Sequence, residues 1–123
     1  MKILFSHQNF PAQFGEFAMY LARNGWEVAY ATAADHAKPV SGVSILRMKP
    51  PREPAEDVHR LALPVERMAL NGQGFARSAI AARERGYVPD IVMAHAGWGS
   101  GTFTKAVSVS YTHLTLPTNT VTW

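Results

Sequence analysis

Apolar and polar positions follow one another along the chain in blocks that predict a strand and then a helix. Residues 2–5 are a short apolar run, of the length expected for a strand buried on both faces. After a polar loop, apolar residues recur at the spacing of an amphipathic helix that ends at Asn24-Gly25. These residues are Phe14, Phe17, Ala18, Leu21 and Ala22. We expect this helix to begin near Pro11, since a proline in the first turn loses no hydrogen bond.

The later blocks continue the alternation of strands and helices. Residues 26–31, 43–47 and 90–95 are predicted strands, and the prolines at 50, 51 and 54 exclude regular structure after the third strand. A long helix is predicted at about 64–85, weakened at Gly72 and Gly74, and a further one at 102–107. The apolar positions of the helix at 64–85 are Val65, Met68, Ala69, Gly72, Phe75, Ala76, Ala79 and Ile80. The fold class is therefore α/β: a Rossmann-like, doubly wound parallel sheet with helices on both faces.

Two polar loops are expected on the same edge of this sheet. His7-Gln8-Asn9 follows the first strand, and residues 95–100 follow the fourth. Parallel strands bring their carboxyl ends together, so neighbouring strands would place both loops at one crevice, where α/β sheets bind ligands. One interpretation is a polar substrate cleft in which Trp98 stacks on a sugar or base. The alternative is structural: His7 caps the next helix, His95 is a core histidine with its hydrogen bonds satisfied, and Trp98 closes the sheet edge.

Composition excludes several classes of protein. At 123 residues the chain is one domain or part of one, and it has no cysteine for disulfides or thiolate metal sites. The net charge of +3 is too small and scattered to argue for nucleic acid, although it suits anionic ligands or an anionic membrane surface. The five histidines lack the spacing of metal ligands, and Gly72-Gln73-Gly74 is not preceded by a strand, as a dinucleotide fingerprint requires. With no signal-peptide pattern or membrane-spanning run, the expected location is cytoplasmic.

Three stretches together resemble the N-terminal domain of a family-four glycosyltransferase. They are KILFSHQNFPAQF from residue 2, NGWEV from residue 24 and GYVPDIVMAHAGWG from residue 86, and the similarity covers residues 1 to about 107. The resemblance implies a GT-B architecture, in which an N-terminal domain holds the acceptor across a cleft from a C-terminal domain that binds the nucleotide-sugar donor. The implied cleft residues after the first strand are His7, Gln8, Asn9, Phe10 and Gln13. Those after the fourth strand are His95, Gly97, Trp98 and Gly99.

The resemblance also implies the activity and its partners. The parent enzyme would be a retaining transferase that moves a sugar from a nucleotide-sugar to a sugar or lipid-linked acceptor. This half would need no metal or other cofactor and no nucleic acid. A peripheral contact of the parent enzyme with a membrane is compatible with the resemblance. Relatives usually carry an acidic residue after the Gly-Trp-Gly turn, where this chain has Ser100, so that carboxylate's contact is not expected here. The catalytic residues are not identified by this stretch of sequence.

The resemblance ends before the chain does. Residues 1–107 are expected to be a truncated acceptor-side domain, inactive alone because the donor domain is missing. Residues 108–123 have no charged side chain and no helical period. They resemble a translated sequencing-adapter segment, and the alternative is a genuine serine- and threonine-rich strand at the sheet edge, up to about Leu116. Two other functions stay open: a solitary Rossmann-like nucleotide-binding module, and a fragment of a nucleotide-sugar epimerase.

Overall fold

The described residues form a parallel sheet of five strands. The computed structural model describes residues 1–35, 37, 38, 40–95, 97, 99 and 113–116. The strands are β1 (Lys2–Ser6), β2 (Glu27–Thr32), β3 (Val43–Arg47), β4 (Ile91–His95) and β5 (His113–Leu116). Their order in the sheet is β3-β2-β1-β4-β5, and each neighbouring pair is parallel. This confirms the predicted α/β, Rossmann-like parallel sheet.

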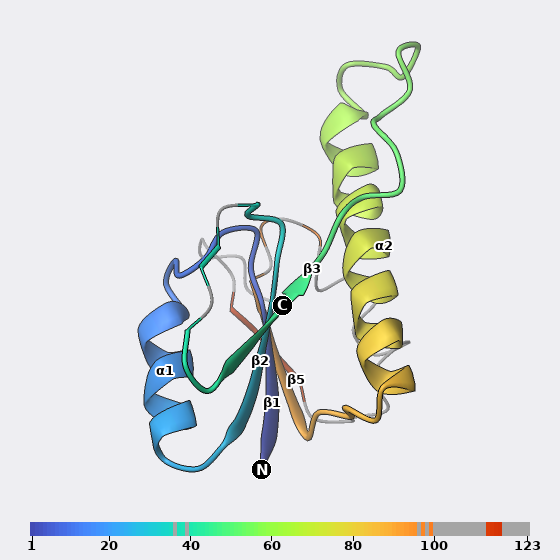
Figure 1. Cartoon of the computed structure of the whole chain (residues 1–123). Coiled ribbons are helices and arrows are strands. Elements are labelled where there is room, and N and C mark those ends of the chain that lie inside the picture. Colours follow the sequence, from blue (N-terminus) through green and yellow to red (C-terminus); the bar gives the residue numbers. More distant parts are fainter. Residues whose placement is uncertain (36, 39, 96, 98, 100–112, 117–123) are drawn as a thin grey trace.

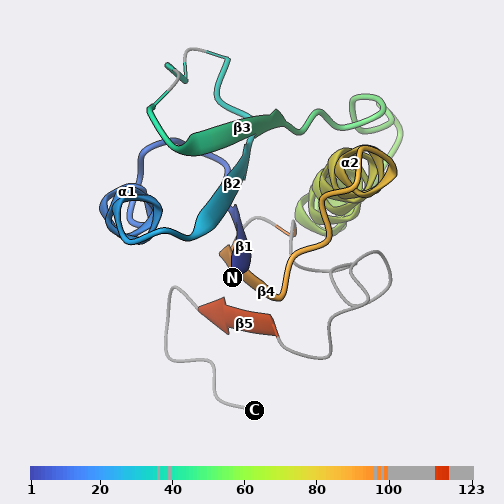
Figure 2. The same cartoon turned by 60° about the horizontal axis from the view of Figure 1, so that its bottom comes forward.

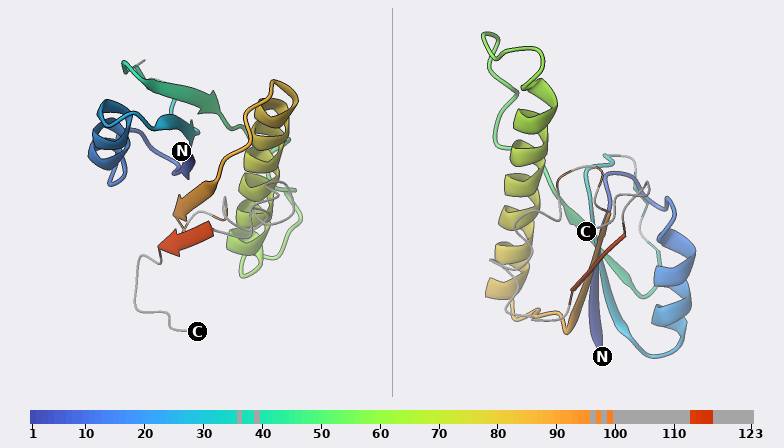
Figure 3. Two further views of the ribbon diagram at one scale, coloured as in Figure 1. Left: turned by 90° about the horizontal axis from the view of Figure 1, so that it is seen from below. Right: turned by 180° about the vertical axis from the view of Figure 1, so that it is seen from behind.

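Two helices cover opposite faces of the sheet. Figure 1 shows α1 (Gly15–Arg23) on one side of the strands and α2 (Leu63–Glu84) on the other. Under α1, the core contains Phe5, Phe14 and Tyr30, and under α2 it contains Leu4, Phe75 and Val92. Successive residues of β1 therefore supply the two cores in turn, as the period of a strand requires. Figure 2 and the left view of Figure 3 show the same layers from nearer the strand ends, with β5 beyond β4 at the sheet edge.

The order of the strands marks where a ligand should bind. From β1 the chain builds β2 and β3 to one side, and then α2 carries it back to β4 on the other side of β1. In open α/β sheets, ligands bind beyond the carboxyl ends of the strands at such a reversal. The structure therefore directs attention to the residues that follow β1 and β4.

The predicted start of the first helix was wrong. Helix α1 begins at Gly15, four residues after Pro11, because the intervening loop is tied to the sheet. The Tyr30 hydroxyl donates to the carbonyl oxygens of Asn9 at 3.0 Å and Pro11 at 3.2 Å. The predicted end was right: the helix stops at Arg23, and Gly25 follows with a φ of 88°.

Parts of both predicted apolar stripes are not buried. Phe17 on α1 is 44% exposed, and on α2 the exposed fractions are 68% for Val65, 40% for Met68 and 43% for Ile80. The first turns of α2 are exposed because the amino-terminal half of the helix extends past the carboxyl ends of the strands (Figure 1). An apolar period therefore predicted the helix correctly, but not how much of it the sheet covers.

Helix α2 runs without a break through Gly72 and Gly74. Gly74 has a packing reason, because a Cβ there would lie 2.7 Å from the carbonyl oxygen of Lys49, just beyond β3. The missing side chain lets the chain leaving β3 pass directly against α2. In the described part of the chain, no helix is both long and apolar enough to cross a bilayer. The helix predicted at 102–107 lies outside the described residues.

Candidate functional site

Two histidines meet where β1 and β4 end. The register pairs Ser6 with Ala94, so the next residue of each strand is a histidine at the same edge of the sheet. The rings of His7 and His95 lie 4.5 Å apart between centroids at an interplanar angle of 63°. Both side chains are buried, with exposed fractions of 6% and 5%. The structure thus brings together the two loops that the sequence placed on one edge.

Each histidine fixes the backbone of its own loop. The Nδ1 atom of His7 accepts a hydrogen bond from the backbone N–H of Asn9 at 2.9 Å, and Nδ1 of His95 accepts one from Gly97 at 3.2 Å. A neutral imidazole that accepts at Nδ1 carries its proton at Nε2. A metal bound at Nε2 would need that proton moved, at the expense of the backbone bond. Among the described residues, no group of three or more His, Asp or Glu could hold a metal ion.

The surroundings hold both imidazoles in the neutral form. Burial lowers the pKa of His7 and the neighbouring His95 lowers it further, against a smaller opposing effect of the Asn9 bond. Burial also lowers the pKa of His95. Two cationic rings 4.5 Å apart would repel each other in a site with little water. At neutral pH both imidazoles are therefore uncharged.

The loop after β1 is anchored through its carbonyl groups. The Gln8 carbonyl accepts hydrogen bonds from Ala33 N–H at 3.1 Å and Thr32 Oγ1 at 3.0 Å. Tyr30 holds the next stretch, and burial raises the pKa of its hydroxyl, so it stays a donor. With its backbone held from below, Gln8 presents its amide side chain above the sheet edge.

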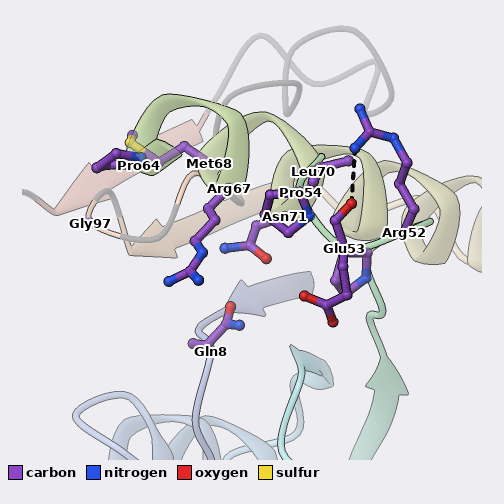
Figure 4. Close-up of a pocket in the computed structure, with 11 residues that line it drawn as sticks. Gln8, Arg52, Glu53, Pro54, Pro64, Arg67, Met68, Leu70, Asn71 and Gly97 are labelled. Carbon is purple, nitrogen blue, oxygen red and sulfur yellow. Dashed lines mark hydrogen bonds between the residues drawn. The ribbon is translucent and has the colours of Figure 1, made fainter. Parts of the chain in front are cut away.

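A cavity lies above this edge, between the sheet and α2. Its volume is about 410 Å³. The lining residues come from the loops after β1 and β4, the segment after β3, and the first turns of α2. They are Gln8, Pro50, Arg52, Glu53, Pro54, Pro64, Arg67, Met68, Leu70, Asn71 and Gly97. Figure 4 shows Arg67 and Asn71 pointing from α2 toward Gln8.

One ion pair fastens the segment after β3 to α2. Arg52 Nη2 donates to Glu66 Oε1 at 3.1 Å, and Glu66 Oε2 accepts a hydrogen bond from the Ala55 N–H at 3.1 Å. Arg52 also donates to the carbonyl of Glu53 at 2.9 Å. Glu66 is thus fully engaged in holding one wall of the cavity in place.

Gly99 allows the loop after β4 to reach α2. It has a φ of 83°, and a Cβ there would lie 2.4 Å from the Met68 carbonyl oxygen. Glycine is therefore required both by the backbone conformation and by the close approach. This contact brings the end of β4 against the helix that supplies Arg67 and Asn71.

The predicted site residues that the structure describes lie in different settings. Gln8 and Gly97 line the cavity, whereas His7 and His95 are buried beneath it as positioning groups. Phe10 is buried in the core under α1, with its ring 4.7 Å from that of Tyr30. Asn9 and Gln13 are exposed on the loop before α1. Trp98 lies outside the described residues, and a binding role for any of these side chains stays a prediction.

Both alternatives for the histidines turn out to need refinement. His7 does not cap α1, whose first turn has no side-chain cap. It caps its own loop instead, and His95 does the same, so the structural interpretation is right that His95 is buried with a bonded ring nitrogen and wrong about what His7 caps. The two interpretations are compatible, because the rings shape the loops whose other residues line the cavity.

Sequence reasoning missed the α2 wall of the cavity. Arg67 and Asn71 were not singled out, and the segment after β3 was described only as irregular. A signal was present: that segment leaves the carboxyl end of a parallel strand, so it belongs to the same edge as the loops after β1 and β4. The long helix gave no such sign, since its extension beyond the sheet is a tertiary feature.

A comparison with protein families identifies this architecture. The model described as "Glycosyl transferase family 4 group" matches residues 24–114, which is most of the 123-residue chain. The chain belongs to this family. The match includes β4, its loop and α2, but it begins after the loop that carries His7 and Gln8. Among curated proteins, none matches the chain.

The family finding confirms the resemblance stated from the sequence. The matched range also reaches residue 114, inside the segment interpreted as a separate tail. The structure places β5 in that segment, parallel to β4 and at the sheet edge. The first residues of that segment, 108–112, lie outside the described residues. A domain boundary at 107 stays a prediction.

Proposed function

We propose that this chain is the acceptor-binding domain of a retaining glycosyltransferase of the GT-B type. The enzyme would transfer a sugar from a nucleotide-sugar to a sugar or lipid-linked acceptor, in the cytoplasm or at its membrane surface. A second domain would bind the donor and complete the active site. No other cofactor and no nucleic acid is part of this proposal.

One observation carries the proposal. A cavity of about 410 Å³ lies at the carboxyl ends of β1 and β4, where the strand order reverses, in a chain of the glycosyl transferase family 4 group. Its lining combines amides and charged groups with apolar walls of Pro54, Pro64 and Met68. Sugars need both, since their hydroxyls require hydrogen bonds while their C–H faces pack on apolar surface.

The residues of this chain would act by positioning. The amides of Gln8 and Asn71 would hydrogen-bond acceptor hydroxyls, and the buried histidines would hold in place the loops that carry Gln8 and Gly97. Holding an acceptor in line with a donor supplies much of the catalytic effect in a two-substrate reaction. The groups that stabilise the departing nucleotide would come from the donor domain.

The solitary nucleotide-binding module is the weaker candidate. A nucleotide bound at β1 needs a glycine-rich turn that brings backbone N–H groups to the phosphates. Here β1 is followed by His7-Gln8-Asn9, and its backbone is committed to β2 through the Gln8 carbonyl. The epimerase is also the weaker candidate, because the family that the chain matches is a glycosyl transferase group and nothing in the described residues argues against it.

Saturation-transfer NMR of the purified chain separates these functions. We expect weak binding of common hexoses and disaccharides, on the millimolar scale, and binding of UDP or GDP that is no tighter than this. With UDP- and GDP-sugars present, the chain alone should neither transfer nor hydrolyse the sugar above background. Tight binding of the free nucleotide, or turnover by the chain alone, would contradict an acceptor-binding domain.

A further inference from the structure

Two opposite charges line the cavity without meeting each other. Arg67 enters from α2 and Glu53 from the segment after β3. Within the part of the chain that the structure describes, neither side chain takes part in a hydrogen bond or an ion pair. Figure 4 shows both pointing toward the space above Gln8.

The neighbouring charges explain why Arg67 is left uncompensated. The acid next to it in sequence, Glu66, is bound to Arg52 at 3.1 Å and to the Ala55 N–H at 3.1 Å. Arg52 is therefore neutralised, and the ion pair fixes the wall from which Glu53 projects. The cavity keeps one positive and one negative group, separated by the space that a ligand would fill.

We propose that the acceptor carries an anionic group, a phosphate or a carboxylate, which Arg67 binds while a hydroxyl of the same molecule donates to Glu53. This inference rests on the proposed function and names the substrate class of that site. A guanidinium presents two parallel N–H donors that match the oxygens of a phosphate or carboxylate. The carboxylate of Glu53 accepts from hydroxyls and repels a second anion, so it sets the direction in which the acceptor lies.

The amides complete the recognition. Gln8 sits between the two charges, and Asn71 lies one turn along α2 from Arg67, on the same face of the helix. An acceptor bound at Arg67 would therefore place its ring over Gln8, with Pro64 and Met68 beside it. A neutral sugar would use the amides and Glu53, but would leave the guanidinium without its partner.

The test is an amide NMR titration of the full 123-residue chain at low ionic strength. The probes are glucose, glucose 6-phosphate, glucuronate and a soluble short-chain phosphatidylglycerol. We expect at least one of the three anions to bind about tenfold or more tightly than glucose, with shifts at Gln8, Asn71 and Gly97. The anion with the highest affinity shows whether the site prefers a sugar phosphate, a sugar acid or a lipid headgroup.

Variants of single residues identify the group responsible. Arg67→Gln should reduce the affinity for the preferred anion about tenfold, to that for glucose, and Arg67→Lys should keep part of the preference. Arg60→Gln removes an exposed arginine outside the cavity lining and should change nothing, which controls for net charge. Glu53→Gln should weaken the binding of glucose and of the preferred anion alike. A folded amide spectrum of each variant accompanies its titration.

The outcomes separate this inference from the proposed function. Equal affinity for glucose and all three anions, or equal losses in Arg67→Gln and Arg60→Gln, would overturn the anionic acceptor and leave an acceptor-binding domain intact. No shift at the cavity with any sugar, charged or neutral, would overturn both.

Discussion

The buried pair His7 and His95 owes its neutral state mainly to burial, and the neighbouring His95 adds to the effect on His7. In the unfolded chain, each imidazole takes up a proton near pH 6.5, whereas the pKa of the folded group lies lower. Between these values the unfolded state binds more protons. The stabilisation from a neutral pair is therefore complete above pH 6.5, and it is lost as the pH falls below that value.

This predicts a pH dependence that a single variant should reduce. Urea unfolding at a series of pH values should show the free energy of unfolding falling below pH 6.5, by at most about 1.4 kcal/mol per pH unit for each histidine. His7→Asn keeps an acceptor for the Asn9 N–H but cannot be protonated, so it should flatten this slope. His59→Asn is the matched control, because exposed His59 also accepts from a backbone N–H two residues on, at 3.1 Å. An equal pH dependence of the free energy of unfolding in both variants would contradict the stabilisation assigned to the neutral pair.

Gly99 joins the loop after β4 to α2, and this can be tested with a second glycine. Gly99→Ala introduces a Cβ 2.4 Å from the Met68 carbonyl, in addition to the cost of a positive φ. Gly25→Ala has a similar φ of 88° and no atom within 4 Å, so it isolates the backbone cost of about 1–2 kcal/mol. We expect Gly99→Ala to lose about 1–3 kcal/mol more than this control in urea unfolding. Equal losses would mean that the loop does not rest on α2.

At the scale of elements, α2 combines two functions along its length. Its carboxyl-terminal half buries Phe75, Ala79 and Ala82 against the sheet, and its amino-terminal half extends past the strands to wall the cavity. Gly74 lies in its middle, where the chain from β3 crosses. The helix thus ties the core to the site, and a change at the crossing should be felt in the core.

Replacing Gly74 by alanine measures that crossing. Alanine favours a helix over glycine by about 1 kcal/mol, but its Cβ would lie 2.7 Å from the Lys49 carbonyl oxygen. We expect the clash to prevail, with a net loss of about 1–2 kcal/mol in urea unfolding. Gln73→Ala, at the adjacent exposed position of α2, should change stability by less than about 0.5 kcal/mol. A Gly74→Ala protein more stable than the original would show that the backbone at Lys49 moves away from the added Cβ at little cost.

The elements also show how far the sequence could predict the structure. Strands β1 to β4 were predicted to within one residue at either end, because short apolar runs between turn signals are local features. The start of α1 was missed because the loop before it is held by Tyr30, far along the chain. The stripe on α2 predicted a helix, yet Val65 and Met68 are exposed, since a period does not say where the partner sheet ends.

The candidate site followed the same division. Proximity of the loops at His7 and His95 was predictable, since it depends only on which parallel strands are neighbours. The α2 wall was not, because Arg67 looks like any solvated arginine until the helix is placed over the strand ends. The roles of the two histidines were also hidden, since each bonds to a backbone N–H that no sequence pattern specifies.

At the scale of the whole molecule, the proposed function depends on one placement: the ligand binds where β1 and β4 end, under α2. The direct test is a residue-resolved amide map of the chain titrated with glucose and glucose 6-phosphate. We expect shifts at Gln8, Asn71 and Gly97, which line the cavity, and none at Lys2, Glu27 or Asp90, at the opposite ends of the strands. Shifts gathered at those opposite ends, or spread evenly over the chain, would contradict it.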